Sequence, residues 1–378
     1  MKGMEAKLEK IYLDYNASTP LAPEVVEAMQ PLLTDFYGNP SALHWAGRPV
    51  KELLFRARQQ VADLLSCSAE EMILTSGGSE ANNLALKGYY FQHQQKGTHI
   101  ISSKMEHPAI LNPLKFLERM GAKITLVDVD EHGMVSPDEI EAAITEETIL
   151  ITIMHANNEV GTIQPIAEIG KIAQKHGIAF HTDASQSAGK IPIDVNELNV
   201  DMLTIAGHKL YGPKGIGALY LRKGTVVEPL IHGAGHEFGV RAGTENTLLA
   251  VGLGKACELA KKHVHSSKVK ELTNYFWQQL KKEFDQRVVL NGHEEKRLPN
   301  TLNVSFVRKI GQDLLSAMPL LAASTGSACH SGRIDLSPVL KEMGVPENIG
   351  MGAIRFSLGR PTTKEEIDQV ISWLKELI

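Results

Sequence analysis

Cysteine is scarce in this chain of 378 residues, which contains only Cys67, Cys257 and Cys329. None of the three belongs to a CxxC pair or to a zinc-ligand spacing, and three cysteines in so long a chain do not form a disulfide framework. This usage predicts a reducing compartment, and we expect the cytoplasm. No metal-ligand set is expected, and each thiol has to be interpreted from its own surroundings.

Long apolar runs and an excess of positive charge are also missing. Apolar runs such as "TILITIM" are far too short to cross a bilayer, and the opening "MKGMEAKLEK" lacks the apolar core of a signal peptide. The formal net charge is −5, from 39 Lys and Arg against 44 Asp and Glu. We therefore expect neither a membrane-bound protein nor a nucleic-acid-binding surface. Internal repeats and low-complexity tracts are absent as well.

The chain does contain a long alternation of strand and helix patterns. Between about residues 70 and 222, apolar runs such as "EMILTS", "THIISS" and "GIAFHTD" alternate with helical patterns such as "PIAEIGKIAQKH". This alternation predicts a mainly parallel sheet covered on both faces. After a long helix expected over 247–264, the pattern changes to one helix, two strands and a terminal helix. We predict a large α/β domain at 16–261 and a small α+β domain formed by 1–15 and 262–378.

Polar side chains stand at the ends of several predicted strands. In "LTSGGSEANN" (74–83), two glycines precede a helix that begins near Ser79, and such a helix start suits a phosphate, although plain capping explains it equally well. Asp183 ends another strand, with Gln186 three residues later. His107 follows a third strand and could stack on a planar ligand or move protons. Asn158 follows a fourth. Helix capping or turn chemistry explains each of these singly.

Lys209 lies in "LTIAGHKLYGPKGIGALYL" (203–221), at the end of an apolar run. Desolvation lowers the pKa of a lysine and makes it nucleophilic toward carbonyls, and the adjacent His208 could donate to a phosphate. A surface lysine in a turn is the simpler explanation of this residue alone. Taken together, a phosphate-type helix start, a stacking histidine, an aspartate and a lysine at the ends of strands in one sheet match the needs of pyridoxal 5'-phosphate.

Three further residues come from the second half of the chain. Cys329 lies among small residues in "AASTGSACHSGRIDLSPVL" (322–340), where an accessible thiol beside a histidine is a candidate nucleophile. Cys67 and Cys257 are instead expected to be small buried hydrophobes. Arg355, in "IRFSLGRPTT", could clamp a substrate carboxylate or form an ion pair at a domain surface. Thr244, in "GVRAGTENT", could serve a phosphate or a neighbouring subunit.

These motifs resemble those of cysteine desulfurases, in the class V aminotransferase group of pyridoxal-phosphate enzymes. The resemblance runs from "YLDYNASTP" (12–20) to "IRFSLGRPTT" and rests on "GNPSA", "TSGGSEANN", "EHPAI", "MHANNEVG", "HTDASQSAGK", "GHKLYGPKGIGALY", "RAGTEN" and "GSAC". It implies the α/β architecture of fold-type I pyridoxal-phosphate-dependent transferases, with a mainly parallel seven-stranded sheet in the large domain and a small α+β domain. It also implies a homodimer whose sites draw on both subunits.

The resemblance implies a role for each candidate residue. Lys209 would bind the cofactor's aldehyde and move protons at the substrate's α-carbon, and Cys329 would attack the substrate's sulfur, leaving alanine and a persulfide. Arg355 would bind the substrate's carboxylate. The resemblance also implies that His107 stacks on the cofactor's ring and that Asp183 lies at the ring nitrogen. Gln186 and Asn158 would lie at the phenolic oxygen, with Asn158 also near the substrate. The phosphate would be bound by Gly78, Ser79, His208 and the partner subunit's Thr244.

The sequence departs from the family pattern in two places. Ala206 stands where the family usually has a serine, so one hydrogen bond to the phosphate should be missing. Selenocysteine lyases also tend to have an apolar residue there, and they share the run "ACHS" (328–331). The sequence given ends at "SWLKELI", without the C-terminal extension with which iron–sulfur desulfurases dock their scaffold, which leaves delivery to such a scaffold open.

We therefore expect a desulfurase that acts on L-cysteine and passes sulfur to an acceptor protein, for iron–sulfur cluster or thio-cofactor assembly. The alternatives are a selenocysteine lyase that acts on L-selenocysteine and a non-catalytic protein that retains the cofactor fold.

Overall fold

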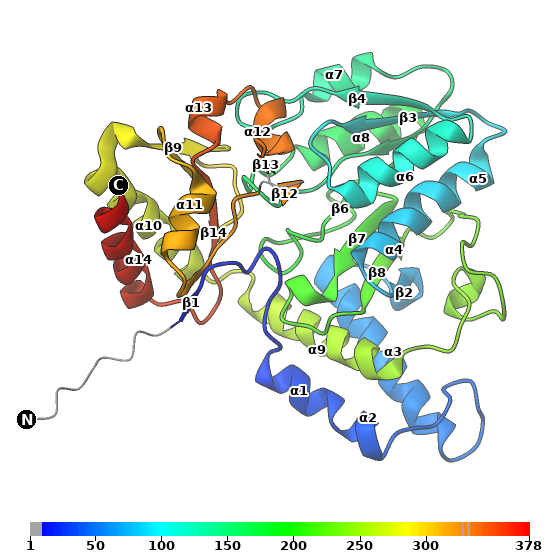
Figure 1. Cartoon of the computed structure of the whole chain (residues 1–378). Helices are drawn as coiled ribbons and strands as arrows, with labels where there is room; N and C mark the ends of the chain where they lie inside the picture. Colours follow the sequence, from blue (N-terminus) through cyan, green and yellow to red (C-terminus); the bar gives the residue numbers. More distant parts are fainter. Residues whose placement is uncertain (1–9, 327–328, 331–332) are drawn as a thin grey trace, which may run out of the picture.

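A seven-stranded sheet forms the centre of the larger part of the molecule (Figure 1). The computed structural model describes residues 10–326, 329–330 and 333–378. The strand order is β2-β8-β7-β6-β5-β3-β4, in which only β8 runs antiparallel to its neighbours. The predicted mainly parallel seven-stranded sheet is thereby confirmed. The strands are β2 (Met72–Thr75), β3 (His99–Ser103), β4 (Lys123–Val127), β5 (Thr148–Thr152), β6 (Ala179–Asp183), β7 (Met202–Ala206) and β8 (Gly217–Leu221).

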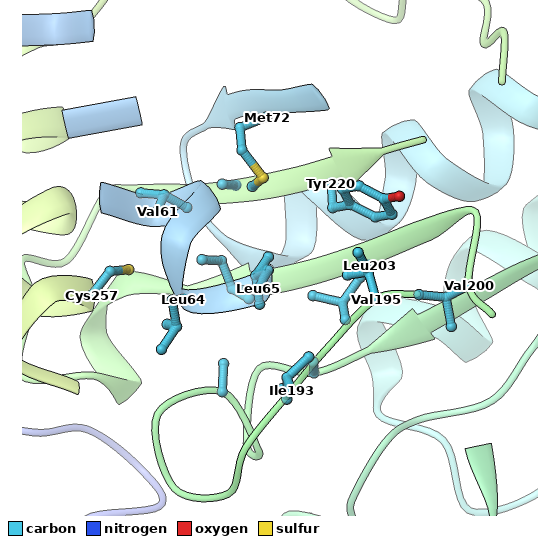
Figure 2. Close-up of a cluster of buried hydrophobic side chains, with 14 of the residues drawn as sticks. Val61, Leu64, Leu65, Met72, Ile193, Val195, Val200, Leu203, Tyr220 and Cys257 are labelled. Atoms are coloured by element: carbon cyan, nitrogen blue, oxygen red, sulfur yellow. The ribbon is translucent and has the colours of Figure 1, made fainter. Parts of the chain in front are cut away.

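Helices cover both faces of this sheet because its strands alternate their apolar side chains between the two. Met72 and Tyr220 point into the core under α3 (Gly47–Leu65) and α9 (Thr247–His263), where Leu65 and Cys257 also lie (Figure 2). Ile73 belongs to the core of the opposite face, together with residues of α4 (Gly78–Asn83) and α6 (Pro108–Arg119). The first of these cores also takes up one face of α8 (Ile166–His176).

The smaller part of the molecule is built on a three-stranded antiparallel sheet of order β14-β10-β9. Its strands are β9 (Val288–Asn291), β10 (Thr301–Phe306) and β14 (Ala353–Ser357), and the helices α10 (Lys268–Phe284) and α14 (Lys364–Leu377) contribute to its core. The rings of Phe276 and Phe356 lie 4.9 Å apart in that core. Ile11 and Leu13 join it from the start of the chain, through the parallel pair β1 (Ile11–Tyr12) and β11 (Leu321–Ala322). The predicted domain limits stay a prediction, which these separate cores support.

The remaining helices and strands are short connections or lie at the edges of these two parts. They are α1 (Pro23–Met29), α2 (Pro31–Thr34), η1 (Ala69–Glu71), the π-helical turn η2 (Leu84–Gly88), α5 (Tyr89–His93), α7 (Pro137–Ala142), η3 (Gly207–Lys209), η4 (Glu237–Gly239), η5 (Asp285–Arg287), α11 (Gly311–Ala317), β12 (Cys329–His330), β13 (Arg333–Ile334), α12 (Pro338–Glu342) and α13 (Glu347–Gly350). Among the described residues, no helix is both long and apolar enough to cross a membrane.

Candidate active site

A cavity of about 380 Å³ opens at the carboxyl ends of β6 and β7. The parallel pairing of these strands sets Asp183 opposite Thr204, so the segments that follow both strands reach the cavity together. This is the edge of an open α/β sheet at which ligands bind. The sequence-predicted residues that line the cavity are Gly78, Ser79, His107, Asn158, Asp183, Gln186, His208, Lys209 and Arg355.

Lys209 lies in the short helix η3, directly after β7. Its ammonium donates hydrogen bonds to the backbone carbonyls of Asn16 and Ala17, the latter at 3.1 Å. Burial lowers the pKa of Lys209 to about 8, helped by the positive charge of Arg355 and opposed by Asp14 and Asp183. A substantial fraction of Lys209 is therefore neutral near pH 8, as a nucleophilic amine must be.

Asp183 is buried at the end of β6, and both of its oxygens are held in place. Oδ2 accepts a hydrogen bond from Asn82 Nδ2 at 2.7 Å, and Oδ1 accepts one from the backbone N–H of Ser185 at 2.9 Å. No lysine, arginine or histidine of the described chain forms an ion pair with this carboxylate. A buried carboxylate with neutral partners that lines a cavity suits a cationic group of a ligand.

A close approach of backbone and small side chains forms another wall of the cavity. Gly77 has φ 152°, a conformation that favours glycine, and a Cβ on Gly78 would lie 3.0 Å from Ser185 Oγ and 3.4 Å from Ala206 Cβ. Ala206 thus faces Gly78 without a hydroxyl group, at the place where the sequence predicts a missing hydrogen bond. Ser79 and Ser185 supply hydroxyl donors nearby.

His107 and His208 line the same cavity as neutral imidazoles. His107 caps helix α6, and its Nδ1 accepts a hydrogen bond from the Ala109 N–H at 3.1 Å, so its ring proton is on Nε2. Although the ring is exposed within the open cavity, partial desolvation lowers its pKa, with a smaller contribution from Lys209 and an opposing one from Asp183. Burial lowers the pKa of His208 to about 4, assisted by the charges of Lys209 and Lys214.

Arg355 reaches the cavity from β14, in the smaller part of the molecule. Its side chain is buried and donates to Asp14 Oδ1 at 2.7 Å and to the carbonyl of Asn158 at 3.0 Å. Its Nε has no hydrogen-bond partner within the described part of the chain. Arg355 therefore forms an ion pair at the cavity, and its predicted binding of a substrate carboxylate stays a prediction.

Thr244 is the one sequence-predicted site residue with a described side chain that does not line this cavity. Thr244 is exposed outside the cavity lining, so its predicted place in the partner subunit's site stays a prediction. Cys329 belongs to β12, which pairs with β13, and its side chain lies outside the described residues. Of the other two thiols, Cys257 is fully buried and Cys67 half-buried, and burial raises the pKa of both, that of Cys67 to about 12. Both are therefore poor nucleophiles.

Sequence reasoning missed several residues that organise the cavity. Asn16, in the N-terminal segment, forms hydrogen bonds with Lys209, Gln186, Thr301 and Asn158. Its sequence surroundings do not predict these contacts. The other residues missed are Asp14, Asn82 and Lys190. The available signal was that Asp14 and Asn16 lie in "YLDYNASTP", Asn82 in "TSGGSEANN" and Lys190 in "HTDASQSAGK", all of which are motifs of the resemblance.

Comparison with known proteins identifies the group to which this arrangement belongs. Residues 11–370 match the model of the aminotransferase class-V family, and the chain belongs to that family. The cysteine desulfurase IscS of Dictyoglomus turgidum is 48% identical over 373 residues, which are 98% of this chain and 94% of the relative.

Two solved structures are also similar over almost their whole length. A NifS-like protein superposes with a TM-score of 0.91 at 35% identity, covering 97% of this chain and 99% of its own. A structure described as SspA in complex with cysteine superposes with a TM-score of 0.83 at 40% identity, covering 92% and 98%. The fold is therefore that of the fold-type I pyridoxal-phosphate enzymes, as the sequence resemblance predicts.

Proposed function

We propose that this protein is a pyridoxal-phosphate-dependent cysteine desulfurase. In the net reaction, L-cysteine and the Cys329 thiol give L-alanine and a Cys329 persulfide, from which an acceptor protein takes the sulfur. The observation that carries the proposal is the meeting of Lys209, Asp183 and Arg355 in one cavity. An amine of lowered pKa, a buried carboxylate and an arginine are what an amino acid and a pyridine aldehyde require.

The residues of the cavity fit pyridoxal 5'-phosphate. Asp183 has no described cationic partner and could hold a protonated ring nitrogen, and Lys209 could bind the aldehyde. Gly78 leaves room for a phosphate that Ser79, Ser185 and His208 could contact, although Ala206 offers it no hydroxyl. When bound, this cofactor would supply an electron sink for bond cleavage beside the α-carbon of an amino acid.

The chain's own groups would then divide the remaining work. Arg355 would bind the substrate's carboxylate while Asp14 and Asn158 hold its guanidinium in place. Lys209, neutral in part near pH 8, would accept and return the proton at the α-carbon. His107 would cover one face of the ring, held by its hydrogen bond from Ala109. Cys329 would take the sulfur, since the raised pKa values of Cys67 and Cys257 make both poor thiolates.

We also propose a homodimer in which Thr244 of each subunit serves the other subunit's phosphate. Its position outside the lining of its own chain's cavity supports this arrangement. A second candidate activity, selenocysteine lyase, is favoured by one observation: Ala206 faces Gly78 without a hydroxyl, which agrees with the resemblance to selenocysteine lyases at this position. In that case Cys329 would not be needed to extract the chalcogen.

The test is turnover of the reconstituted protein on L-cysteine and L-selenocysteine in parallel, with a reductant, by measuring sulfide, selenide and alanine. We expect sulfide and alanine from L-cysteine, and almost complete loss of sulfide release in Cys329→Ala. Selenide with negligible sulfide would replace the proposal by the lyase activity. Alanine from neither substrate would leave a non-catalytic protein with a retained cofactor fold.

A further inference from the structure

A second lysine, Lys190, stands behind the candidate site, and the proposed reaction gives it no task. Its ammonium donates hydrogen bonds of 2.8 Å to Gln186 Oε1 and 2.8 Å to Asn16 Oδ1. The side chain is half-buried and lines a neighbouring cavity of about 400 Å³, to which Lys209 also contributes. No carboxylate in the described chain forms an ion pair with Lys190. Buried lysines are usually paired with a carboxylate, so a half-buried lysine whose described partners are both amide oxygens calls for an explanation.

The two partners of Gln186 fix which way its amide points. A lysine ammonium can only donate, so the group of Gln186 that faces it must be the carbonyl oxygen. The backbone carbonyl of Asn16 can only accept, and it receives Gln186 Nε2 at 2.9 Å. Because Gln186 lines the cofactor cavity, the second hydrogen of Nε2 is left as its donor. Lys190 and the Asn16 carbonyl together orient Gln186 as a donor toward the cavity.

Lys190 also reaches Lys209 through Asn16. The side-chain oxygen of Asn16 accepts from Lys190 at 2.8 Å and from Asn300 Nδ2 at 3.0 Å, while its backbone oxygen accepts from both Gln186 and Lys209. The two lysines therefore hold opposite sides of one residue. Replacing Lys190 would leave Gln186 Oε1 without its described donor and Asn16 Oδ1 with Asn300 alone, which loosens the hold on both amides.

We propose that Lys190 is a positioning residue that fixes Gln186 as a hydrogen-bond donor toward the phenolic oxygen of bound pyridoxal 5'-phosphate and holds Asn16 against Lys209. This inference rests on the proposed function. The charged and titratable groups near the two lysines are Arg355, Asp14, Asp183 and His208, and the neighbouring cavity that both lysines line adds Tyr15, Tyr211, His263, Lys268 and Arg360. Burial lowers the pKa of Lys190 itself, helped by the charges of Lys209 and Arg355.

The expected consequence is a shift in the titration of the bound cofactor. A donor to the phenolic oxygen disfavours protonation at the Lys209 nitrogen. Without Lys190, the absorbance of the bound cofactor should change at a pH higher by at least about 0.5 unit, a threefold change in proton affinity. The visible band itself should still form, because Lys209 is retained.

The experiment compares five full-length proteins loaded with pyridoxal 5'-phosphate: wild type, Lys190→Met, Gln186→Met, the double variant, and Lys171→Met. Lys171 is an exposed residue of α8 that lines neither cavity, and it serves as the control. Each protein is titrated by absorbance between pH 5 and 10, and circular dichroism verifies its fold. We expect an upward shift in Lys190→Met, none in Lys171→Met, and a smaller effect of Lys190→Met when Gln186 is already replaced.

The outcomes separate this inference from the proposed function. If wild type forms no cofactor band, the proposed function fails. If wild type forms the band and Lys190→Met titrates like wild type, the positioning role is overturned while the proposed function stands. A shift of equal size with and without Gln186 would show that Lys190 does not act through that amide, and would overturn the inference too. Should Lys190→Met fail to fold, Lys190→Leu, which also lacks a donor, replaces it in both backgrounds with the same expected direction and the same refuting result.

Discussion

Arg355 and Asp14 lie 341 residues apart in the sequence, and Arg355 Nη2 is 2.7 Å from Asp14 Oδ1 at the candidate active site. The pair joins β14 of the smaller part to the segment that crosses from the start of the chain toward the seven-stranded sheet. A substrate carboxylate would therefore meet a guanidinium that is already oriented by one carboxylate and one backbone carbonyl. Orientation of this kind reduces the entropy lost on binding.

Arg355→Lys tests the importance of that planar, oriented group. A lysine ammonium cannot serve Asp14, the Asn158 carbonyl and a substrate carboxylate together in the geometry that the guanidinium allows. We expect KM for L-cysteine to rise about 10- to 100-fold, the loss of one to two charged hydrogen bonds, with a smaller change in kcat. Steady-state kinetics of alanine formation provides the measurement, and equal losses in kcat and kcat/KM would contradict a binding role.

Cofactor uptake should report the lowered pKa of Lys209. Below about pH 8 the ammonium form dominates, and above that pH the neutral amine does. Because only the neutral amine attacks an aldehyde, the uptake rate of pyridoxal 5'-phosphate should rise about tenfold per pH unit below pH 8 and level off above it. Stopped-flow absorbance between pH 6 and 10 measures this profile. A rate that continues to rise to pH 10 would be that of an ordinary lysine, and Lys209→Ala should form no visible band at any pH.

Glu106 should make folding stability fall as the pH rises. It is buried, accepts hydrogen bonds from Ser103 Oγ at 2.9 Å and the Met154 N–H at 2.8 Å, and burial raises its pKa to about 8 from the usual 4.5. The folded chain therefore keeps a proton that the unfolded chain releases above pH 4.5. The stability from this group is fully present below pH 4.5 and is lost as the pH rises toward 8.

Glu106→Gln keeps an acceptor for both donors and cannot ionise. The difference in unfolding free energy between this variant and wild type should thus move in favour of the variant from pH 5 to pH 8. Denaturant unfolding at several pH values gives that difference directly. A constant difference would mean that Glu106 ionises alike in the folded and unfolded chains.

Gly326 is a position where a methyl group should be costly. A Cβ there would lie 2.4 Å from both Cδ and Oε1 of Glu159, whose carboxyl group is buried, and Gly326 has φ 68°. Gly326→Ala should lower stability by about 1–3 kcal/mol and reduce sulfide release. Gly344→Ala is the matched control, since Gly344 has φ 72° with no atom within 4 Å of its Cβ position. Similar losses in the two variants would attribute the effect to backbone strain alone.

The sequence predicts the sheet well because its strands are short apolar runs separated by clear helix signals. The pattern of "SPDEIEAAI" predicts a helix, which is α7 (Pro137–Ala142), where Ser136 accepts a hydrogen bond from the Glu139 N–H as an N-cap. The pattern of "SEANNLALKGYYFQ" predicts one helix, whereas the structure divides this segment into α4, the π-helical turn η2 and α5. Gly88, at that division, lies so close to the Glu228 carbonyl that a Cβ would be 2.7 Å from it. A contact between residues so far apart in the sequence cannot be predicted from the local spacing of apolar residues.

The sequence predicts the site residues that lie at the ends of strands, but it does not predict the residues that hold them in place. Asp183 and Lys209 follow apolar runs, so the direction of a parallel sheet places them at one edge. Lys190 contacts Asn16 only because the N-terminal segment crosses the edge of the sheet. The residue pattern of either segment alone does not predict this contact. The side-chain position of Cys329 remains a matter of prediction.

Ile11 and Leu13 belong to a core whose other residues lie between 276 and 374. This separation in the sequence limits the order in which the parts of the chain can fold. During synthesis the first strand has no partner until Leu321 has left the ribosome, so almost the whole chain must emerge before that core closes. The segment that follows the strand carries Asp14 and Asn16 to Arg355, Gln186 and Lys209. A nascent chain can thus complete its seven-stranded sheet first, while the candidate active site is completed only after β11 has emerged to pair with β1.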